Sequence, residues 1–494
     1  MVYSRRMRLD PDICYDALLS RNRRFDGWFF VGVRTTGVYC RPVCPVKPPK
    51  AQNCLYFPTA AAAEKAGFRP CMRCRPELAP GHGLLDVSGN LANAAATLID
   101  DGFLNGGRSV HALAQRVGVT ERHLRRIFAA QFGVSPVEFA QTQRLLMAKR
   151  LLTDTALPVA VVASTAGFGS VRRFNDLFLQ RYGLNPLRLR KSAAAGASAS
   201  GDMTFPLPYR PPFAWHELMR FLAQRQIDGV EWIDAQRYLR TVDLPAPRGA
   251  GRVTGWVSVS HVPHRFALAV TVSPALTPVV PTVLARVRRL FDLDSRPDVI
   301  DAHLGELADG SPGLRVPGAF DGVEIANRAI VGEHLATTHA DAVLARLAAH
   351  FGPRVDGGAP PTLAHAMPAV STLAALPPAA LRSIGVARDA AEAIVSLAQA
   401  VAEGTLALEP MAPLDATLAA LRAMPGFDER AVQYVAMRAM AWPNAFPADE
   451  RLLLATRAGD RPPVASSLPR TSRWAPWRAY AALHVWRLHG DAVQ

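Results

Sequence analysis

Lysine is missing from most of this chain: in 494 residues, no lysine follows Lys191. Up to Lys191, 28 Lys and Arg face 13 Asp and Glu, a balance of +15. Beyond it, 28 Arg face 28 acidic residues, so the whole positive excess lies at the front. The positive electrostatic field of such an excess predicts that the first 191 residues attract nucleic acid.

Long apolar runs and a signal peptide are also missing. The longest apolar runs are too short for a membrane span, and the first eight residues carry no apolar core. Only six cysteines occur, four of them at metal-binding spacing, which excludes a disulfide scaffold and indicates a reducing compartment. We therefore expect a cytoplasmic protein with no membrane partner. Its length and 49% apolar content predict a globular chain of three or four domains.

The cysteines at metal-binding spacing follow the pattern C-x3-C, 26 residues, C-x2-C. This pattern predicts a tetrahedral Zn²⁺ site with two ligands from each of two loops. The four expected ligands are Cys40, Cys44, Cys71 and Cys74. A closed site of this type is normally structural, and that interpretation stays open. The remaining two, Cys14 and Cys54, are expected to be small core residues.

Arginines accompany these cysteines and favour a role beyond structure. They would draw an anion such as DNA phosphate toward the thiolates. The four candidates for DNA contact are Arg34, Arg41, Arg69 and Arg73.

Residues 110–128 and 159–178 repeat one pattern: helix, glycine-containing turn, helix. In the first copy Thr120 is the expected N-cap of the second helix. Two helix-turn-helix units of this kind resemble the AraC-type DNA-binding domain, which implies double-stranded DNA as a partner. The candidates for DNA contact on the second helices are His123, Arg125, Arg126, Arg172 and Arg173. The sequence leaves open which of them reach bases and which reach phosphates.

The fold class is expected to be multidomain and mainly α. Residues 28–33 predict a short strand, and the alternating stretches 254–259 and 266–272 predict an antiparallel sheet. The predicted units are a small α+β zinc domain (1–80), an all-α double helix-turn-helix domain (85–191), a flexible linker of small residues (192–204), a small antiparallel β/α domain (205–280) and an all-α domain (281–494).

The stretches Arg34-Thr-Thr-Gly-Val-Tyr-Cys40-Arg-Pro and Gly67-Phe-Arg-Pro-Cys71-Met-Arg-Cys74, followed by the helix-turn-helix units, resemble the front half of the Ada family of adaptive-response regulators. The resemblance implies irreversible transfer of a methyl group from a DNA methyl phosphotriester to the first cysteine, Cys40. A neutral triester is not repelled by a zinc tetrathiolate centre of formal charge −2. Methylation lowers that charge to −1, so DNA binding tightens and transcription is switched on, with RNA polymerase as the expected partner. No Pro-Cys-His-Arg stretch is found, so activity on O6-methylguanine is expected to be absent.

Residues 205–494 resemble the AlkA-like 3-methyladenine DNA glycosylases of the helix-hairpin-helix family. The matching stretches are Pro211-Pro-Phe-Ala-Trp215, Arg289-Leu-Phe-Asp-Leu293, Pro312-Gly-Leu-Arg-Val-Pro-Gly318, Arg328-Ala-Ile-Val-Gly332 and Trp474-Ala-Pro-Trp-Arg-Ala-Tyr480. The resemblance implies hydrolytic excision of alkylated bases that are flipped into an aromatic pocket. It places Tyr434 and Trp477 in that pocket, and a role in the protein core stays open for each of them. Because a strand-cutting glycosylase forms a Schiff base through an amine, usually lysine, this lysine-free half is expected only to release the base.

This sequence departs from the family at several positions. The hairpin pattern Leu-Pro-Gly-x-Gly becomes Met424-Pro425-Gly426-Phe427-Asp428. Gly426 remains a candidate for phosphate contact, whereas Asp428 replaces a glycine that we expect to need a positive φ. Arg430 stands where the best-known members have tryptophan. His334 aligns with the leucine that fills the gap left by the flipped base.

The catalytic carboxylate is the main open point. Glu450 aligns with the catalytic Asp, with one methylene more, and Asp449 lies one residue earlier. A misplacement of about 1 Å costs about a hundredfold in rate, so three alternatives remain: Glu450, Asp449, or no competent carboxylate. In the third case the protein is a methyl-sensing regulator whose back half only binds DNA. No small-molecule cofactor is expected beside Zn²⁺.

Overall fold

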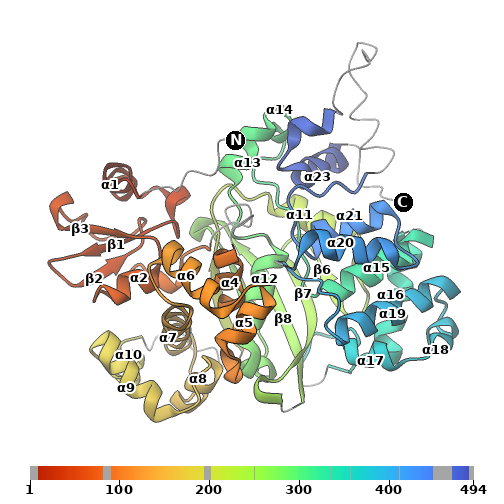
Figure 1. Ribbon diagram of the computed structural model, residues 1–494, viewed down its shortest axis with the longest axis horizontal. Helices are drawn as coiled ribbons and strands as arrows, with labels where there is room; N and C mark the ends of the chain where they lie inside the picture. The colour runs from red at the N-terminus through yellow and green to blue at the C-terminus, as the bar shows by residue number, and fades with distance from the viewer. Residues whose placement is uncertain are drawn as a thin grey trace.

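The computed structural model describes residues 9–81, 91–193, 202–249, 251–334, 337–355, 358–410, 412–448 and 470–488. Figure 1 shows a front half (residues 9–193) on the left and a back half (residues 202–488) on the right. Within the described ranges, no helix is both long and apolar enough to cross a membrane.

The first unit, the cysteine domain (residues 9–81), is a four-stranded sheet with strand order β3-β1-β2-β4 and two helices. Its elements are α1 (Pro11–Leu19), β1 (Phe30–Val33), β2 (Val38–Cys40), β3 (Cys54–Phe57), α2 (Ala60–Lys65) and β4 (Arg69–Pro70). The predicted strand at 28–33 is therefore confirmed as β1. Because β2 runs parallel to β4, Cys40 and Cys71 emerge side by side from neighbouring strands. Cys14 and Cys54 are buried with Phe29 and Val31, as expected of core residues.

The second unit is the double helix-turn-helix domain (residues 91–193). Its helices are α4 (Leu91–Asp100), α5 (Val110–Arg116), α6 (Glu121–Phe132), α7 (Pro136–Asp154), α8 (Val159–Thr165), α9 (Val171–Tyr182) and α10 (Pro186–Ala193). The Thr120 hydroxyl accepts from the His123 backbone N–H, which confirms the predicted N-cap of α6. Ser170 caps α9 in the same way, so the two units repeat in structure as in sequence.

The back half opens with a five-stranded antiparallel sheet of order β5-β9-β8-β7-β6. Its elements are β5 (Met203–Pro208), α11 (Trp215–Ala223), β6 (Glu231–Ile233), β7 (Arg237–Pro245), β8 (Arg252–Val262) and β9 (Ala267–Val272). The stretches 254–259 and 266–272 lie in β8 and β9, which pair as antiparallel neighbours. The predicted sheet is thus confirmed, with β8 longer than its alternating segment.

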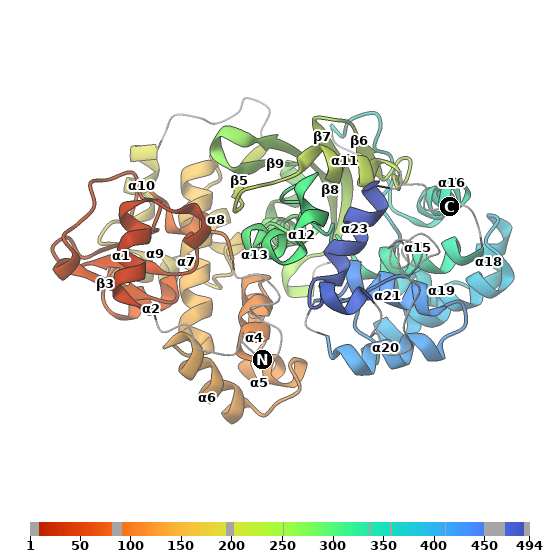
Figure 2. The ribbon, with the colours of Figure 1, turned by 90° about the horizontal axis from the view of Figure 1, so that it is seen from above.

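Helices make up the rest of the back half, as predicted from its apolar pattern. They are α12 (Val280–Leu290), α13 (Pro297–Leu304), α14 (Glu306–Asp309), α15 (Gly322–His334), α16 (Thr337–Phe351), α17 (Val370–Ala375), α18 (Pro378–Ser383), α19 (Arg388–Ala402), α20 (Leu414–Ala423), α21 (Glu429–Arg438) and α23 (Arg478–Leu488). Figure 2 shows α12 and α13 between the front half and the outer helices.

The two halves share one apolar core. The cluster runs from Leu145 in α7 through the sheet of the back half to Trp486 in α23. Helix α7 packs against β5, and helix α8 packs against the short helix η7 (Pro274–Val279). The two described ends of the predicted linker, residues 192–204, belong to regular elements. Helix α10 continues through Ala193, and β5 begins at Met203 within the shared core.

Candidate metal centre and nucleic-acid interface

The four predicted cysteine ligands come together in the structure. Their Sγ atoms all lie within 4.8 Å of one another, and each residue is at most 8% exposed. Tetrahedral zinc thiolates, with Zn–S distances of about 2.3 Å, place sulfurs about 3.8 Å apart, so the cluster fits Zn²⁺. Over the described part of the chain, no other group of His, Cys, Asp or Glu is arranged to hold a metal.

Backbone contacts hold this cluster in shape. The Arg41 N–H donates to Cys74 Sγ at 3.3 Å, and the Cys71 N–H donates to the Tyr39 carbonyl at 3.0 Å. Hydrogen bonds with the other three thiols, together with burial, raise the pKa of Cys40 when no cation is present. A divalent cation is what such a donor set needs to hold every sulfur as a thiolate.

A cavity of about 580 Å³ adjoins the cysteines. Cys40, Cys44 and Cys71 line it, whereas Cys74 does not. Its other walls are mainly apolar and come from the cysteine domain and from the second helix-turn-helix unit, with cationic side chains among them. The apolar members are Leu18, Val31, Val33, Val38, Val46, Pro48, Pro49, Pro70, Met72, Leu184 and Leu189, with Tyr182 beside them, and the cationic members are Lys47, Arg69 and Arg73.

The arginines near the cluster fall into two groups. Arg34, Arg69 and Arg73 are exposed, as a phosphate contact requires. Arg41 is only 7% exposed, and its guanidinium is bound to both carboxylate oxygens of Asp26 and to the Cys74 carbonyl. This geometry argues against Arg41 as a direct DNA contact, because its guanidinium is buried and paired within the protein.

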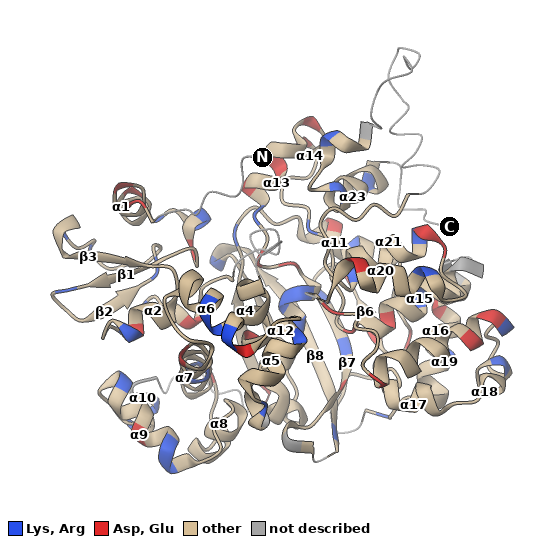
Figure 3. Cartoon of the chain, viewed as in Figure 1, with Lys and Arg blue, Asp and Glu red and all other residues tan. Residues whose placement is uncertain are grey.

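The predicted DNA-contact residues of the helix-turn-helix units lie on α6 and α9. Arg125, Arg126, Arg172 and Arg173 are exposed, and His123 is half-buried. Arg125 pairs with Glu121 at 2.6 Å, and Arg126 approaches the His123 ring. Figure 3 shows basic segments on both helices.

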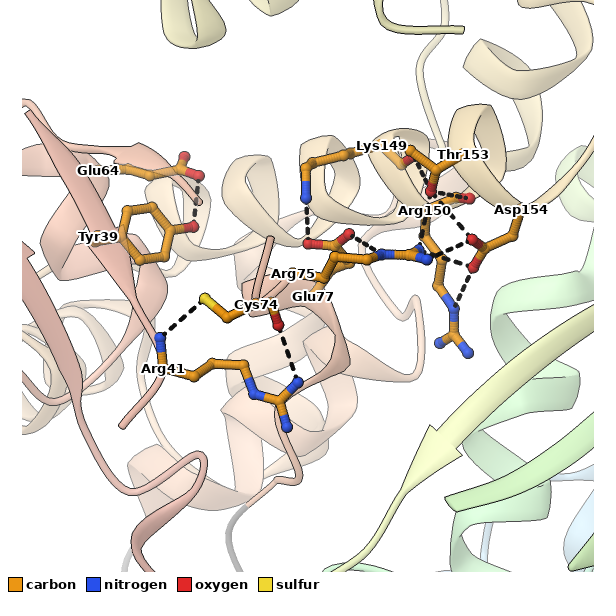
Figure 4. A network of polar contacts seen from close by, with 10 residues as sticks. All are labelled: Tyr39, Arg41, Glu64, Cys74, Arg75, Glu77, Lys149, Arg150, Thr153 and Asp154. Atoms are coloured by element: carbon orange, nitrogen blue, oxygen red, sulfur yellow. Dashed lines mark hydrogen bonds and ion pairs between the residues drawn. The ribbon is translucent and has the colours of Figure 1, made fainter. Parts of the chain in front are cut away.

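A buried polar network that the sequence did not reveal joins the cysteine domain to α7 (Figure 4). Arg75 follows Cys74 directly and binds Glu77 at 3.0 Å and Asp154 at 2.7 Å. Glu77 also binds Lys149 at 2.6 Å. The signal that was available in the sequence is Lys149, a lysine that directly follows Ala148 and lies two residues before Leu151 in the apolar pattern of α7.

Glu64 forms a second buried contact between the same units. Its carboxylate accepts from the Tyr39 hydroxyl at 3.1 Å and from the Thr142 hydroxyl at 3.0 Å. Burial raises the pKa of Glu64 to about 7. Because Tyr39 precedes Cys40, this carboxyl helps to position the strand that carries the first cysteine.

The backbone of the hairpin at residues 424–428 explains why this chain tolerates Asp at position 428, where the family pattern has glycine. Gly426 takes φ +80°, and an added Cβ would lie 3.1 Å from Ala393 Cβ. Asp428 has φ −78° and caps α21, accepting from the Ala431 N–H at 2.6 Å. The expectation that this position needs a positive φ is therefore wrong, because it is an extended N-cap at which Asp is favoured. Arg430 is exposed nearby.

The two aromatic candidates for the base pocket are half-buried. The Tyr434 hydroxyl accepts from Arg438 at 2.8 Å, and Trp477 packs edge-to-face on Tyr480 with ring centres 5.6 Å apart. Asp449 and Glu450 lie outside the described residues. His334 ends α15, and its side chain also lies outside them.

Comparisons with known proteins follow the same division of the chain. Family models match in three places: the metal binding domain of Ada over residues 13–77, a helix-turn-helix domain over 113–192 and the AlkA N-terminal domain over 204–321. These matches confirm the resemblances to the Ada and AlkA-like families drawn from the sequence.

Three curated relatives cover different parts of the chain. DNA-3-methyladenine glycosylase 2 of Escherichia coli (strain K12) is 33% identical over 288 residues, which is 58% of this chain and 98% of that protein. The bifunctional transcriptional activator/DNA repair enzyme Ada of the same strain is 34% identical over 164 residues, covering 32% of this chain and 43% of Ada. The probable bifunctional transcriptional activator/DNA repair enzyme AlkA of Mycobacterium tuberculosis (strain H37Rv) is 36% identical over 494 residues, covering 97% of each chain. The protein belongs to this family of bifunctional transcriptional activators and DNA repair enzymes, which joins an Ada zinc domain and a helix-turn-helix domain to an AlkA glycosylase.

Proposed function

We propose that Cys40 accepts a methyl group from a methyl phosphotriester in DNA, and that the methylated protein activates transcription. One observation carries this proposal: Cys40 belongs to a buried cluster of four thiols and lines the cavity beside it. Arg34, Arg69 and Arg73 are exposed and available to bind flanking phosphates.

The residues present support direct displacement at the methyl carbon. Zn²⁺, when bound, supplies the charge that keeps the cysteine sulfurs deprotonated at neutral pH. The Cys40 sulfur attacks the methyl carbon; the S–C bond forms, the C–O bond breaks, and the electron pair stays on the phosphate oxygen. The product is an ordinary phosphodiester anion, and no proton moves. A mainly apolar cavity favours the neutral triester over an anionic diester, because burying a charge without a partner is costly.

The transfer acts as a switch because it changes charge. The Cys40 thiolate becomes a neutral thioether, so the protein surface next to the DNA loses one negative charge. Repulsion from neighbouring phosphates falls, and α6 and α9 hold the duplex more tightly. We include contact with RNA polymerase in the proposal, since an activator bound to a promoter must recruit or stimulate it.

The test is mass spectrometry after incubation of the zinc-loaded protein with methylated DNA. Wild type should gain a single methyl group on the peptide that contains Cys40, and Cys40→Ser should gain none. Cys54→Ser is the matched control, because Cys54 is buried in a separate apolar cluster. Methylation of another cysteine, or no methylation, would refute the assignment.

We further propose that the back half hydrolyses the N-glycosidic bond of alkylated bases, with Glu450 or Asp449 as the supporting carboxylate. The relative that matches this half almost end to end is named a DNA-3-methyladenine glycosylase. The hairpin at Gly426 and the start of α21 supply backbone N–H groups for phosphate. Tyr434 and Trp477 supply rings for a flipped base.

Release of 3-methyladenine from alkylated DNA tests this second activity. Wild type should release the base, and one of Glu450→Gln and Asp449→Asn should not. Wild-type release at background level would leave the back half as a DNA-binding module.

A further inference from the structure

Arg210 joins the back half to the cysteine domain. It follows β5 and is 1% exposed. Its Nη2 donates to the carbonyls of Asp26 at 2.9 Å and Gly81 at 2.6 Å, and its Nη1 donates to the Asp294 carbonyl at 2.9 Å. A guanidinium buried this deeply needs acceptors, and carbonyls from both halves provide them. The contact is therefore specific in its geometry and not a chance apposition of two surfaces.

Two glycines show how closely the surfaces fit. A Cβ on Gly27 would collide with the Pro80 carbonyl and lie 3.3 Å from Arg210 Nη2. A Cβ on Gly81 would lie 3.0 Å from the Asp294 carboxylate, which accepts from the Gly81 N–H at 2.7 Å. Glycine at position 27 lets two loops of the cysteine domain meet beside Arg210, and glycine at position 81 lets the second of these loops approach Asp294.

Further contacts extend the interface across both front domains. Arg296 lies over the Trp28 ring at 4.6 Å, and Arg23 lies over the Phe266 ring at 4.4 Å. Among the residues that the structure describes, ion pairs between the halves join Arg289 to Asp101 and Arg116 to Glu409. The halves thus meet at several separated points, which fixes their orientation.

The same interface reaches the cysteine cluster. Asp26, whose carbonyl binds Arg210, uses its carboxylate to hold the Arg41 guanidinium. Arg41 in turn donates to the Cys74 carbonyl at 3.1 Å and, through its backbone N–H, to Cys74 Sγ at 3.3 Å (Figure 4). Asp26 therefore links Arg41, which is hydrogen-bonded to the cysteine cluster, to Arg210, which is hydrogen-bonded across the interface.

In the other direction the contacts lead toward the candidate base pocket. Arg315 is fully buried and donates to the Arg210 carbonyl at 2.6 Å and to the Asp292 carbonyl at 2.7 Å. The Asp292 carboxylate accepts from the Tyr480 hydroxyl at 2.7 Å, and Tyr480 packs on Trp477. These contacts thus connect Arg210 at the interface to Trp477, whose ring is proposed to stack on a flipped base.

We infer that the assembled cysteine cluster holds the back half in its docked position, through Asp26 and Arg210. A metal that ties residues 40–44 to residues 71–74 fixes Arg41, and Arg41 fixes Asp26. When the metal is lost, Arg41 loses its anchor on Cys74, and the Asp26 carbonyl is no longer held in place for Arg210. Coupling of this kind is reciprocal, so docking of the back half also stabilises the metal-bound cluster.

Hydrogen exchange on the full-length zinc-loaded protein, before and after addition of a chelator, tests the inference. Chelation should speed exchange in residues 23–29 and, together with them, in residues 206–213, by about tenfold or more, as expected for loss of several hydrogen bonds to a charged group. In Arg210→Met, residues 206–213 should exchange fast already and no longer respond to chelation. A chelator effect confined to the front half would overturn the inference.

Two further variants keep the result interpretable. Arg265→Met removes an exposed arginine of the same half and should behave as wild type. Asp294→Ala removes the side-chain acceptor of the Gly81 N–H but keeps the backbone carbonyl that accepts from Arg210. This variant therefore covers the case in which Arg210→Met fails to fold. It should weaken the chelator response of residues 206–213, and a full wild-type response would count against the inference. Exchange is read without any methyl transfer, so a failure of Cys40 as acceptor is a separate result.

Discussion

Lys149 Nζ lies 2.6 Å from Glu77 Oε2, and both side chains are almost excluded from water, at 1% and 2% exposed. Burial alone would raise the pKa of Glu77, but Lys149 and Arg75 hold that pKa below its usual value. The pair fixes the loop after Cys74 on α7, so the metal site and the central helix of the DNA-reading domain are parts of one packed body (Figure 4).

Removal of one partner of this pair should destabilise the front half. Lys149→Met leaves a buried carboxylate with Arg75 as its remaining cation, at a cost of about 3 kcal/mol. Calorimetry should show a lower unfolding temperature for the transition that includes the front half, and Lys149→Met with Glu77→Gln should recover part of the loss. Lys65→Met is the control, because the exposed Lys65–Glu138 pair should contribute little. Equal effects of the two lysine substitutions would contradict the argument.

Glu64 should make stability depend on pH. Its folded pKa of about 7 lies above the usual 4.5, so between these values the unfolded chain loses a proton that the folded protein keeps. The free energy of unfolding should therefore fall as pH rises from about 4.5 to about 7, by an amount on the order of 3 kcal/mol. The measurement is the difference in unfolding free energy between wild type and Glu64→Gln across this range. Asp176→Asn, at an exposed position on α9, should leave the slope unchanged.

The cysteine spacing and the repeated helix-turn-helix pattern were enough to predict the cluster of four cysteines and the N-cap of α6. These features depend on residues near each other in sequence, where spacing and capping act directly. The role of Arg41 was not predictable in this way. Its neighbour Cys40 suggested a phosphate contact, but its partner Asp26 lies 15 residues earlier and meets it only after the sheet forms.

The docking of the two halves was not predictable either, for a related physical reason. Arg210 binds carbonyl groups of Asp26 and Gly81, and a backbone carbonyl leaves no trace in residue identity. The Ala, Ser and Gly residues after Lys191 instead predicted a flexible linker. Asp428 is a third case: a positive φ was expected at this position, whereas the backbone there is extended and the carboxylate caps a helix.

The exposed arginines near the cysteine cluster and the buried Arg41 should differ in their effect on DNA affinity. Arg73→Ala removes an exposed charge, so affinity for duplex DNA should fall and the slope of log affinity against log salt should decrease by about one. Arg41→Met removes a buried guanidinium bound to Asp26, so it should weaken zinc retention and leave that slope unchanged in protein that still holds zinc. Binding titrations at several salt concentrations, with zinc measured on the same samples, check both. A salt slope reduced by Arg41→Met as much as by Arg73→Ala would restore Arg41 as a direct contact.

Asp428 offers a test of what the hairpin carboxylate does. Asp428→Asn keeps an oxygen that accepts from the Ala431 N–H and removes the negative charge, so the cap survives. The back half should then bind duplex DNA several-fold more tightly at low salt, because one repulsion from phosphate is gone. Asp428→Ala removes the charge and the cap together, so it should give a similar gain in affinity but lower stability by about 1 kcal/mol. Affinity titrations and thermal unfolding of both variants separate the two effects, and unchanged affinity in Asp428→Asn would show that the carboxylate does not face the DNA backbone.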